Sequence, residues 1–225
     1  IIIGIASVVS VVALGNGSEK KILADISAMG TNTISIFPGR GFGDRRSGRI
    51  KTLTIDDAKV IAKQSYVASA TPQTNSSGTL TYRNTDLSAS LYGVGEQYFD
   101  VRGLKLESGR LFDEGDVKED AQVVVIDQNT KNKLFGEDTD PLGKTILFRK
   151  RPLTVIGVMQ KEENSFGNAD VLMLWSPYTT VMHQITGESH TNSITVKIKD
   201  DANTQVAEKG LTELLKTRHG TEDFF

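Results

Sequence analysis

An uncharged apolar stretch opens the chain and limits what the chain can fold into. Residues 1–14 read IIIGIASVVSVVAL, in which Ser7 and Ser10 carry the only polar side chains. As a helix, this stretch spans about 21 Å, which is shorter than the roughly 30 Å hydrocarbon core of a bilayer. It lacks the basic start and the cleavage site of a signal peptide. Two interpretations stay open: a buried core element, or the outer half of a transmembrane helix, which we favour because its small residues let membrane helices pack closely.

The residues that follow support the membrane interpretation. Residues 15–18 read GNGS and interrupt the apolar stretch, and charged side chains then appear at residues 19–21. Apolar residues next recur at helical spacing up to Gly30, a good residue for ending a helix; they are Ile22, Leu23, Ile26 and Met29. This pattern predicts that residues 1–29 form the end of a membrane helix and its amphipathic extension into water.

Composition excludes several classes of function. The formal net charge is −2 and cysteine is absent. A near-neutral net charge gives no electrostatic case for binding nucleic acid, whose binders usually carry a basic stripe. Without cysteine there are no disulfides, thiol nucleophiles or cysteine-ligated metals.

Candidate chemical motifs fail on their spacing. Gly143-Lys144-Thr145 resembles the end of a phosphate-binding loop, but the glycine required five places earlier is Asp138. The three histidines fall on separate predicted elements without metal-ligand spacing, so we expect them at the surface or at helix caps; they are His183, His190 and His219. We therefore predict no catalytic residue, no metal site and no cofactor site in this chain.

Two other features are candidates for binding rather than catalysis. The glycine-rich connection 38–48 carries Arg40, Arg45 and Arg46, which could dock an acidic partner surface. Tyr92 stands where the β-rich middle of the chain begins, and Phe166 stands in a polar loop. Aromatic rings supply large sealing area without charge. We expect Tyr92 and Phe166 at a cavity wall or gate, with core packing as the alternative.

The pattern of elements predicts an α+β chain. Residues 31–37 alternate as a strand, Thr54 begins a capped helix to about Gln64, and residues 66–74 form the next strand, which together make a βαβ-like unit. The middle of the chain is β-rich with many turns: residues 79–83 and 171–175 are predicted strands, and residues 144–148 and 153–159 a hairpin joined by basic residues 149–151. A strand (193–199) and a helix (203–219) that ends at Gly220 close the chain. We predict two lobes: a discontinuous one, residues 30–90 and 191–225, and an inserted one, residues 91–190.

An ordered set of segments carries a resemblance to a known family. GVGEQYFDVRGLKLESGRLFDEGD begins at Gly93, QVVVID at Gln122, KLFGEDTDPLGKTILF at Lys133 and LTVIGVMQ at Leu153. Together with the opening segment, they resemble the periplasmic domain of MacB-type ABC transporters. The resemblance implies a two-lobed periplasmic domain, in which a discontinuous βαβ porter-like lobe carries an inserted β-rich Sabre-like lobe.

The resemblance also implies partners and a role in efflux and antibiotic resistance. It implies a homodimer at the periplasmic side of the inner membrane, a MacA-like adaptor (membrane fusion protein) and a TolC-like outer-membrane channel. ATP and magnesium would bind a cytoplasmic domain that is not in this chain. Macrolides are the implied substrates. Lipoprotein-releasing and FtsX-like permease ectodomains share the general plan and stay open as alternatives, as does a ligand-sensing receptor ectodomain.

Overall fold

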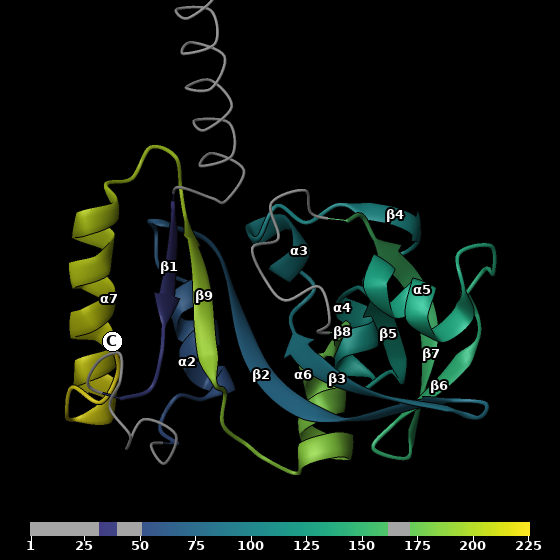
Figure 1. Cartoon of the computed structure of the whole chain (residues 1–225). Coiled ribbons are helices and arrows are strands. Elements are labelled where there is room, and N and C mark those ends of the chain that lie inside the picture. Colours follow the sequence, from purple (N-terminus) through teal and green to yellow (C-terminus); the bar gives the residue numbers. More distant parts are fainter. Residues whose placement is uncertain (1–31, 40–50, 162–171) are drawn as a thin grey trace, which may run out of the picture.

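The computed structural model describes residues 32–39, 51–161 and 172–225. They form a mixed α/β fold around one nine-stranded sheet, with strand order β1-β9-β2-β3-β8-β5-β7-β4 and with β6 paired to β2 and β7 (Figure 1). The predicted mixture of helices and strands is confirmed. The elements are β1 (Thr33–Ile36), α2 (Ile55–Ala62), β2 (Val67–Tyr82), β3 (Thr85–Val94), α3 (Tyr98–Val101), β4 (Leu106–Gly109), α4 (Glu114–Lys118), β5 (Val123–Ile126), α5 (Gln128–Phe135), β6 (Thr145–Phe148), β7 (Arg151–Met159), β8 (Leu172–Pro177), α6 (Tyr178–Thr180), the π-helix η2 (Val181–Thr186), β9 (Ser193–Ile198) and α7 (Thr204–His219).

Strands β1, β9 and β2 form one end of the sheet. Both β1 and β2 pair antiparallel with β9, so β1 and β2 run parallel to each other and α2 connects them. The predicted βαβ-like unit is therefore present, with β9 inserted between its two strands. We call this assembly the helical unit: the described residues of 32–73 together with 190–225.

Helices α2 and α7 cover one face of the helical unit and build its core. Figure 1 shows α7 running alongside β1 and β9. Alternate residues of the strands point toward the helices, and they pack with helix residues into one cluster: Ile36, Leu53, Ala58, Ile61, Val67, Ile194, Val196, Ile198, Ala207, Leu211, Leu215 and Phe224.

Both helices begin and end on residues suited to those positions. The Thr54 side chain accepts from the Asp57 N–H, while the Asp57 side chain accepts from the Thr54 N–H, which is a capping box. Helix α7 ends at Gly220, whose φ of 71° is left-handed, a conformation that glycine adopts without steric cost.

Strand β2 is longer than its sequence predicts. The sequence indicated two strands separated near residues 75–78, whereas β2 runs without a break through its 16 residues. Its first half pairs with β9 and its second half with β3, and the pairing of Ser77 with Ser90 and of Gly78 with Ala89 keeps these two residues in the strand. Figure 1 shows β2 curving from the helical unit across to the other strands.

The remaining strands form what we call the β-rich region, residues 74–161 and 172–189. It has two apolar clusters, one around Phe148 and Leu174 and one around Phe99 and Trp175. The predicted basic hairpin joins β6 to β7: Arg149 and Lys150 have φ of 47° and 66°, as a two-residue type I′ turn requires. The predicted boundary between residues 90 and 91 falls inside β3, and the division into two lobes stays a prediction.

Within the described part of the chain, no helix has both the length and the apolar character needed to cross a membrane. The predicted membrane-helix unit, residues 1–29, lies outside the described residues.

Candidate functional site

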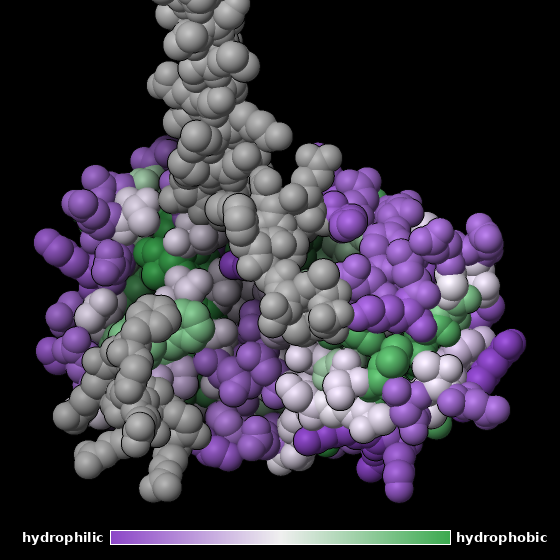
Figure 2. Space-filling model, in the orientation of Figure 1, coloured by the Kyte–Doolittle hydropathy of each residue, from purple (hydrophilic) through white to green (hydrophobic). Residues whose placement is uncertain are grey.

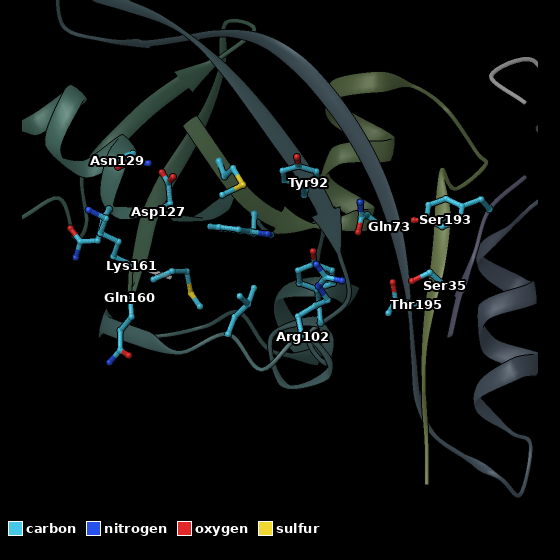
Figure 3. Close-up of a pocket in the computed structure, with 17 residues that line it drawn as sticks. Ser35, Gln73, Tyr92, Arg102, Asp127, Asn129, Gln160, Lys161, Ser193 and Thr195 are labelled. Carbon is cyan, nitrogen blue, oxygen red and sulfur yellow. The ribbon is translucent and has the colours of Figure 1, made fainter. Parts of the chain in front are cut away.

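A cavity of about 530 Å³ lies between the helical unit and the β-rich region (Figure 3). Residues from both parts of the molecule line it, so the tertiary structure assembles it from segments that are far apart in the sequence. In the view of Figure 2, hydrophilic residues cover most of the described surface and apolar residues form separate patches. In the cavity, apolar and polar side chains meet at a concave surface, as is typical of ligand sites.

The parallel strands β3 and β8 contribute Tyr92, Met173 and Trp175 to the apolar lining of the cavity. Tyr92 lies opposite Trp175 in this ladder, and their rings stack with centroids 6.4 Å apart. Met173 is two residues before Trp175 and therefore faces the same side of the sheet. Aromatic and methionine side chains together suit irregular organic ligands, because thioethers adapt to shape; those lining the cavity are Phe37, Tyr92, Tyr98, Met159, Met173 and Trp175.

The wall contributed by the helical unit is polar except for Phe37. Ser35 lies opposite Thr195, and Gln73 lies opposite Ser193, so these side chains form a row across β1, β9 and β2. Figure 3 shows Ser35, Thr195 and Ser193 on one side of the cavity and Asp127, Asn129 and Gln160 on the other. Alternation explains the row: the residues between them point to the helices and the core.

The β-rich region also contributes charged groups to the lining of the cavity. Asp127 is 8% exposed and caps α5, with its Oδ1 accepting from the Thr130 N–H at 2.8 Å. Burial raises the pKa of the Asp127 carboxyl, and hydrogen bonds to Thr130 and Met173 offset that effect only in part. Arg102 and Lys161 are exposed cations that also line the cavity.

A second group of charged residues lies inside the helical unit. The buried Asp57 accepts from Arg218 Nε at 2.7 Å and lies 3.3 Å from His219 Nε2. His219 Nδ1 lies 2.8 Å from Asp223 Oδ1. We call Asp57, Arg218, His219 and Asp223 the charge cluster; it joins the start of α2 to the end of α7 and to the segment that follows.

The charge cluster shifts the pKa values of two of its members. Burial by itself raises the pKa of Asp57, but the hydrogen bonds from Arg218, Thr54 and His219 outweigh it, and the net shift is downward. Burial by itself lowers the pKa of His219, but hydrogen bonds to Asp223 and Asp57 outweigh it, and the net shift is upward. Both shifts favour the charged forms, as expected for groups held by opposite charges.

The structure places one of the predicted site residues in the cavity. Tyr92 lines it, while its role as a gate stays a prediction. Phe166, Arg40, Arg45 and Arg46 lie outside the described residues.

Sequence reasoning missed the partners of Tyr92. Trp175 and Met173 were assigned only to a buried strand, although their spacing of two residues places them on one face. His219 was expected at the surface or at a helix cap. It is the last residue of α7, but its side chain is only 9% exposed, so the expectation was incomplete. Among the described residues, no group of three or more side chains could hold a metal ion.

Comparison with known proteins agrees with the fold. The family model of the MacB-like periplasmic core domain matches residues 1–214. The macrolide export ATP-binding/permease protein MacB of Neisseria meningitidis serogroup A is 90% identical over the whole chain, and that of Aggregatibacter actinomycetemcomitans is 58% identical over 226 aligned positions. In both cases the chain spans 35% of the relative's length.

Solved structures show the same likeness. The crystal structure of the periplasmic region of MacB from Actinobacillus actinomycetemcomitans superimposes with a TM-score of 0.82 at 54% identity, covering 91% of this chain and 92% of that one. The extracellular domain of the noncanonic ABC-type transporter YknZ from Gram-positive bacteria gives a TM-score of 0.72 at 25% identity, covering 86% and 98%. The fold is thus that of an extracytoplasmic domain of an ABC-type transporter. The chain belongs to the MacB-like periplasmic core domain family.

Proposed function

We propose that this chain serves a MacB-type efflux transporter by coupling ATP hydrolysis in a cytoplasmic domain to export of macrolides or other substrates. The observation that carries the proposal is the likeness over the whole chain to proteins named as macrolide exporters. The chain itself performs no reaction in this scheme. ATP and magnesium bind the cytoplasmic domain, and a MacA-like adaptor and a TolC-like channel receive the substrate.

The cavity provides a place for an amphipathic organic molecule. Its wall of aromatic and methionine side chains offers apolar contact, and the row containing Ser35 and Thr195 offers hydrogen bonds from the opposite side. One wall belongs to the helical unit and the other to the β-rich region. A change in the separation of these two parts would change the volume of the cavity, which is how membrane-helix motion could drive substrate toward the adaptor.

Tyr92 gives the most direct test of this proposal. In the full-length transporter, Tyr92→Ala combined with Phe166→Ala should lower macrolide resistance, because the substitutions remove ring area from the substrate path, while protein level and ATP hydrolysis are retained. Tyr92→Phe is the matched control: it keeps the ring that stacks on Trp175 and should retain resistance. Wild-type resistance in the double alanine variant would contradict the role of these rings.

The partners are tested separately from the cavity. Cross-linking of the full-length transporter, followed by peptide mapping, should link this domain to the periplasmic adaptor and to a second copy of itself. Co-purification with a lipoprotein carrier or a cell-wall hydrolase, and not with the adaptor, would instead favour the lipoprotein-releasing or FtsX-like alternative.

A further inference from the structure

The carboxyl group of Asp127 lies beside the apolar lining of the cavity (Figure 3). Val125 is opposed to Trp175 in the antiparallel pair of β5 and β8. The same register sets Asp127 opposite Met173, and the Asp127 N–H donates to the Met173 carbonyl at 3.2 Å. Opposed residues of such a pair place their side chains on one face of the sheet. The cavity therefore has a carboxyl group at the border of its aromatic and methionine lining.

The fold holds this carboxyl group in one position. Asp127 is the N-cap of α5, and its Oδ1 accepts from the Thr130 N–H at 2.8 Å. A strand ends directly before it and a helix begins directly after it, and the residue is only 8% exposed. A ligand that contacts this carboxyl group therefore finds it already oriented, so binding does not have to order a mobile side chain.

Among the described residues, no cation forms an ion pair with Asp127. Burial is the largest influence on the pKa of its carboxyl group and raises it, and none of the opposing influences comes from a positive charge. Arg102 and Lys161 also line the cavity, but both are exposed. Buried charges in proteins are normally paired. Asp127 thus carries a charge that the described part of the protein leaves without a counter-charge, next to a space that can hold a ligand.

We propose that Asp127 is the counter-charge for the ammonium group of an amphipathic monoamine that binds in the cavity. An ammonium group donates charge-assisted hydrogen bonds to a carboxylate and compensates a charge that burial has removed from water. The apolar body of the molecule lies against Met173 and the stacked rings of Tyr92 and Trp175, and aromatic faces also attract cations. The inference rests on the proposed function, for which it names the chemical class of the substrate.

The other charges of the cavity limit the ligand to one cationic group. Arg102 and Lys161 repel a second ammonium group, but because they are exposed, water and salt screen their effect at Asp127. The hydroxyl groups of Ser35 and Thr195 in the polar wall suit uncharged hydrogen-bonding groups. The cavity therefore favours a molecule with an apolar body, one amine and neutral polar substituents.

Binding of three naphthalene probes to the purified full-length transporter tests the proposal. The probes share a ring system and differ in charge: N,N-dimethyl-naphthylethylamine is a cation, naphthylethanol is neutral and naphthylacetate is an anion. Equilibrium dialysis near neutral pH measures the affinity of each. The amine should bind about tenfold more tightly than the alcohol, because hydrogen bonds between charged groups are stronger than those between neutral groups.

Asp127→Asn isolates the charge from the structural role of the residue. Asparagine caps a helix about as well as aspartate does, so the start of α5 is retained. In this variant the amine should lose its advantage, while the alcohol should bind as it does to the unmodified protein. Asp113→Asn is the matched control. Asp113 caps α4 in the same way but is exposed and does not line the cavity, so this variant should keep the preference for the amine.

The unmodified protein gives a second readout that needs no substitution. Protonation of Asp127 removes the counter-charge, and burial raises its pKa above the ordinary value of 3.8. The preference for the amine over the alcohol should therefore decrease as pH falls, beginning above the pH at which exposed aspartates titrate. A preference that stays constant down to about pH 4 would contradict the role of Asp127.

Other outcomes would overturn the proposal as well. Equal affinity of the unmodified protein for the amine and the alcohol would show that the cavity does not recognise the charge. An amine preference that survives in Asp127→Asn would assign it to another group, and tighter binding of naphthylacetate would mean that Arg102 and Lys161 determine the charge preference. Dialysis requires neither export nor ATP hydrolysis, so the two proposals can fail separately. Amine binding without macrolide export would contradict only the proposed function, and export without amine preference would contradict only this inference.

Discussion

The helical unit and the β-rich region reach stability by different means. The helical unit has capped helices on one face of its strands. Its charge cluster, whose Asp57 is 2% exposed, connects the start of α2 with the end of α7. Both parts contain apolar clusters, and the β-rich region also relies on close approach of backbones at glycines. At Gly157, for example, a Cβ would lie 2.5 Å from the Arg110 carbonyl oxygen. We therefore expect the stability of the helical unit to depend on charge and pH, and the stability of the β-rich region to depend on changes in side-chain volume.

This difference fits what each part contributes to the cavity. The β-rich region provides the stacked aromatic wall, which needs tightly packed support behind Tyr92 and Trp175. The helical unit provides Ser35, Ser193 and Thr195 to the polar wall.

The largest expected effect tests the volume sensitivity of the β-rich region. Phe148 is fully buried in its core, and Phe148→Ala should lower the free energy of unfolding by about 3–5 kcal/mol. The control is its neighbour Leu147, which is 38% exposed, so Leu147→Ala should change little. Urea denaturation of the chain measures both. Equal effects of the two substitutions would contradict the assignment of Phe148 to the core.

The next effect tests the charge cluster of the helical unit. Asp57→Asn removes the charge that faces Arg218 and His219, and it should cost about 2–3 kcal/mol, since losing one partner leaves buried polar groups without compensation. Asp56 precedes it in the same turn, but its side chain is 77% exposed. Asp56→Asn should be nearly neutral in the same denaturation assay. A neutral Asp57→Asn would show that the cluster does not fasten the helical unit.

Substitutions at two left-handed glycines, Gly220 and Gly109, distinguish the cost of backbone strain from the cost of close packing. Gly220 ends α7 with open space where a Cβ would stand, whereas a Cβ at Gly109 would collide with the Ile156 carbonyl. Gly220→Ala should cost about 1 kcal/mol from the backbone alone. Gly109→Ala should add overpacking of about 1–3 kcal/mol. Thermal or urea unfolding compares them, and equal costs would refute the idea that the β-rich region depends on close backbone approach.

The smallest expected effect is a pH dependence that originates in the helical unit. The pKa of His219 is raised above its ordinary 6.5 by Asp223 and Asp57, in spite of burial. A raised histidine pKa stabilises the fold fully below pH 6.5, and that stabilisation is lost as pH rises through the folded-state pKa. Denaturation midpoints measured from about pH 5 to about pH 9 should therefore fall with rising pH. His219→Gln should remove this slope, and an unchanged slope in that variant would assign it to another group.

Local patterns in the sequence determined much of the secondary structure. Thr54 with Asp57 predicted the start of α2, and Gly220 predicted the end of α7. The alternation of Ser193–Ile198 predicted β9, and the basic residues at 149–151 predicted the turn between β6 and β7. These features depend on interactions within a few residues along the chain, such as caps, turn conformations and side-chain alternation, so they can be read without knowing the fold.

Only the tertiary structure decided which distant segments meet. It inserted β9 between β1 and β2, joined two predicted strands into the single β2, and brought His219 next to Asp57, which is 162 residues away in the sequence. It also placed Ser35 and Trp175 around one cavity. Strand pairing and burial between remote segments depend on the combined packing of all the elements, and a local pattern carries no record of its eventual partner. For that reason the sequence indicated Tyr92 as a candidate, while the wall that surrounds it could be identified only in the folded chain.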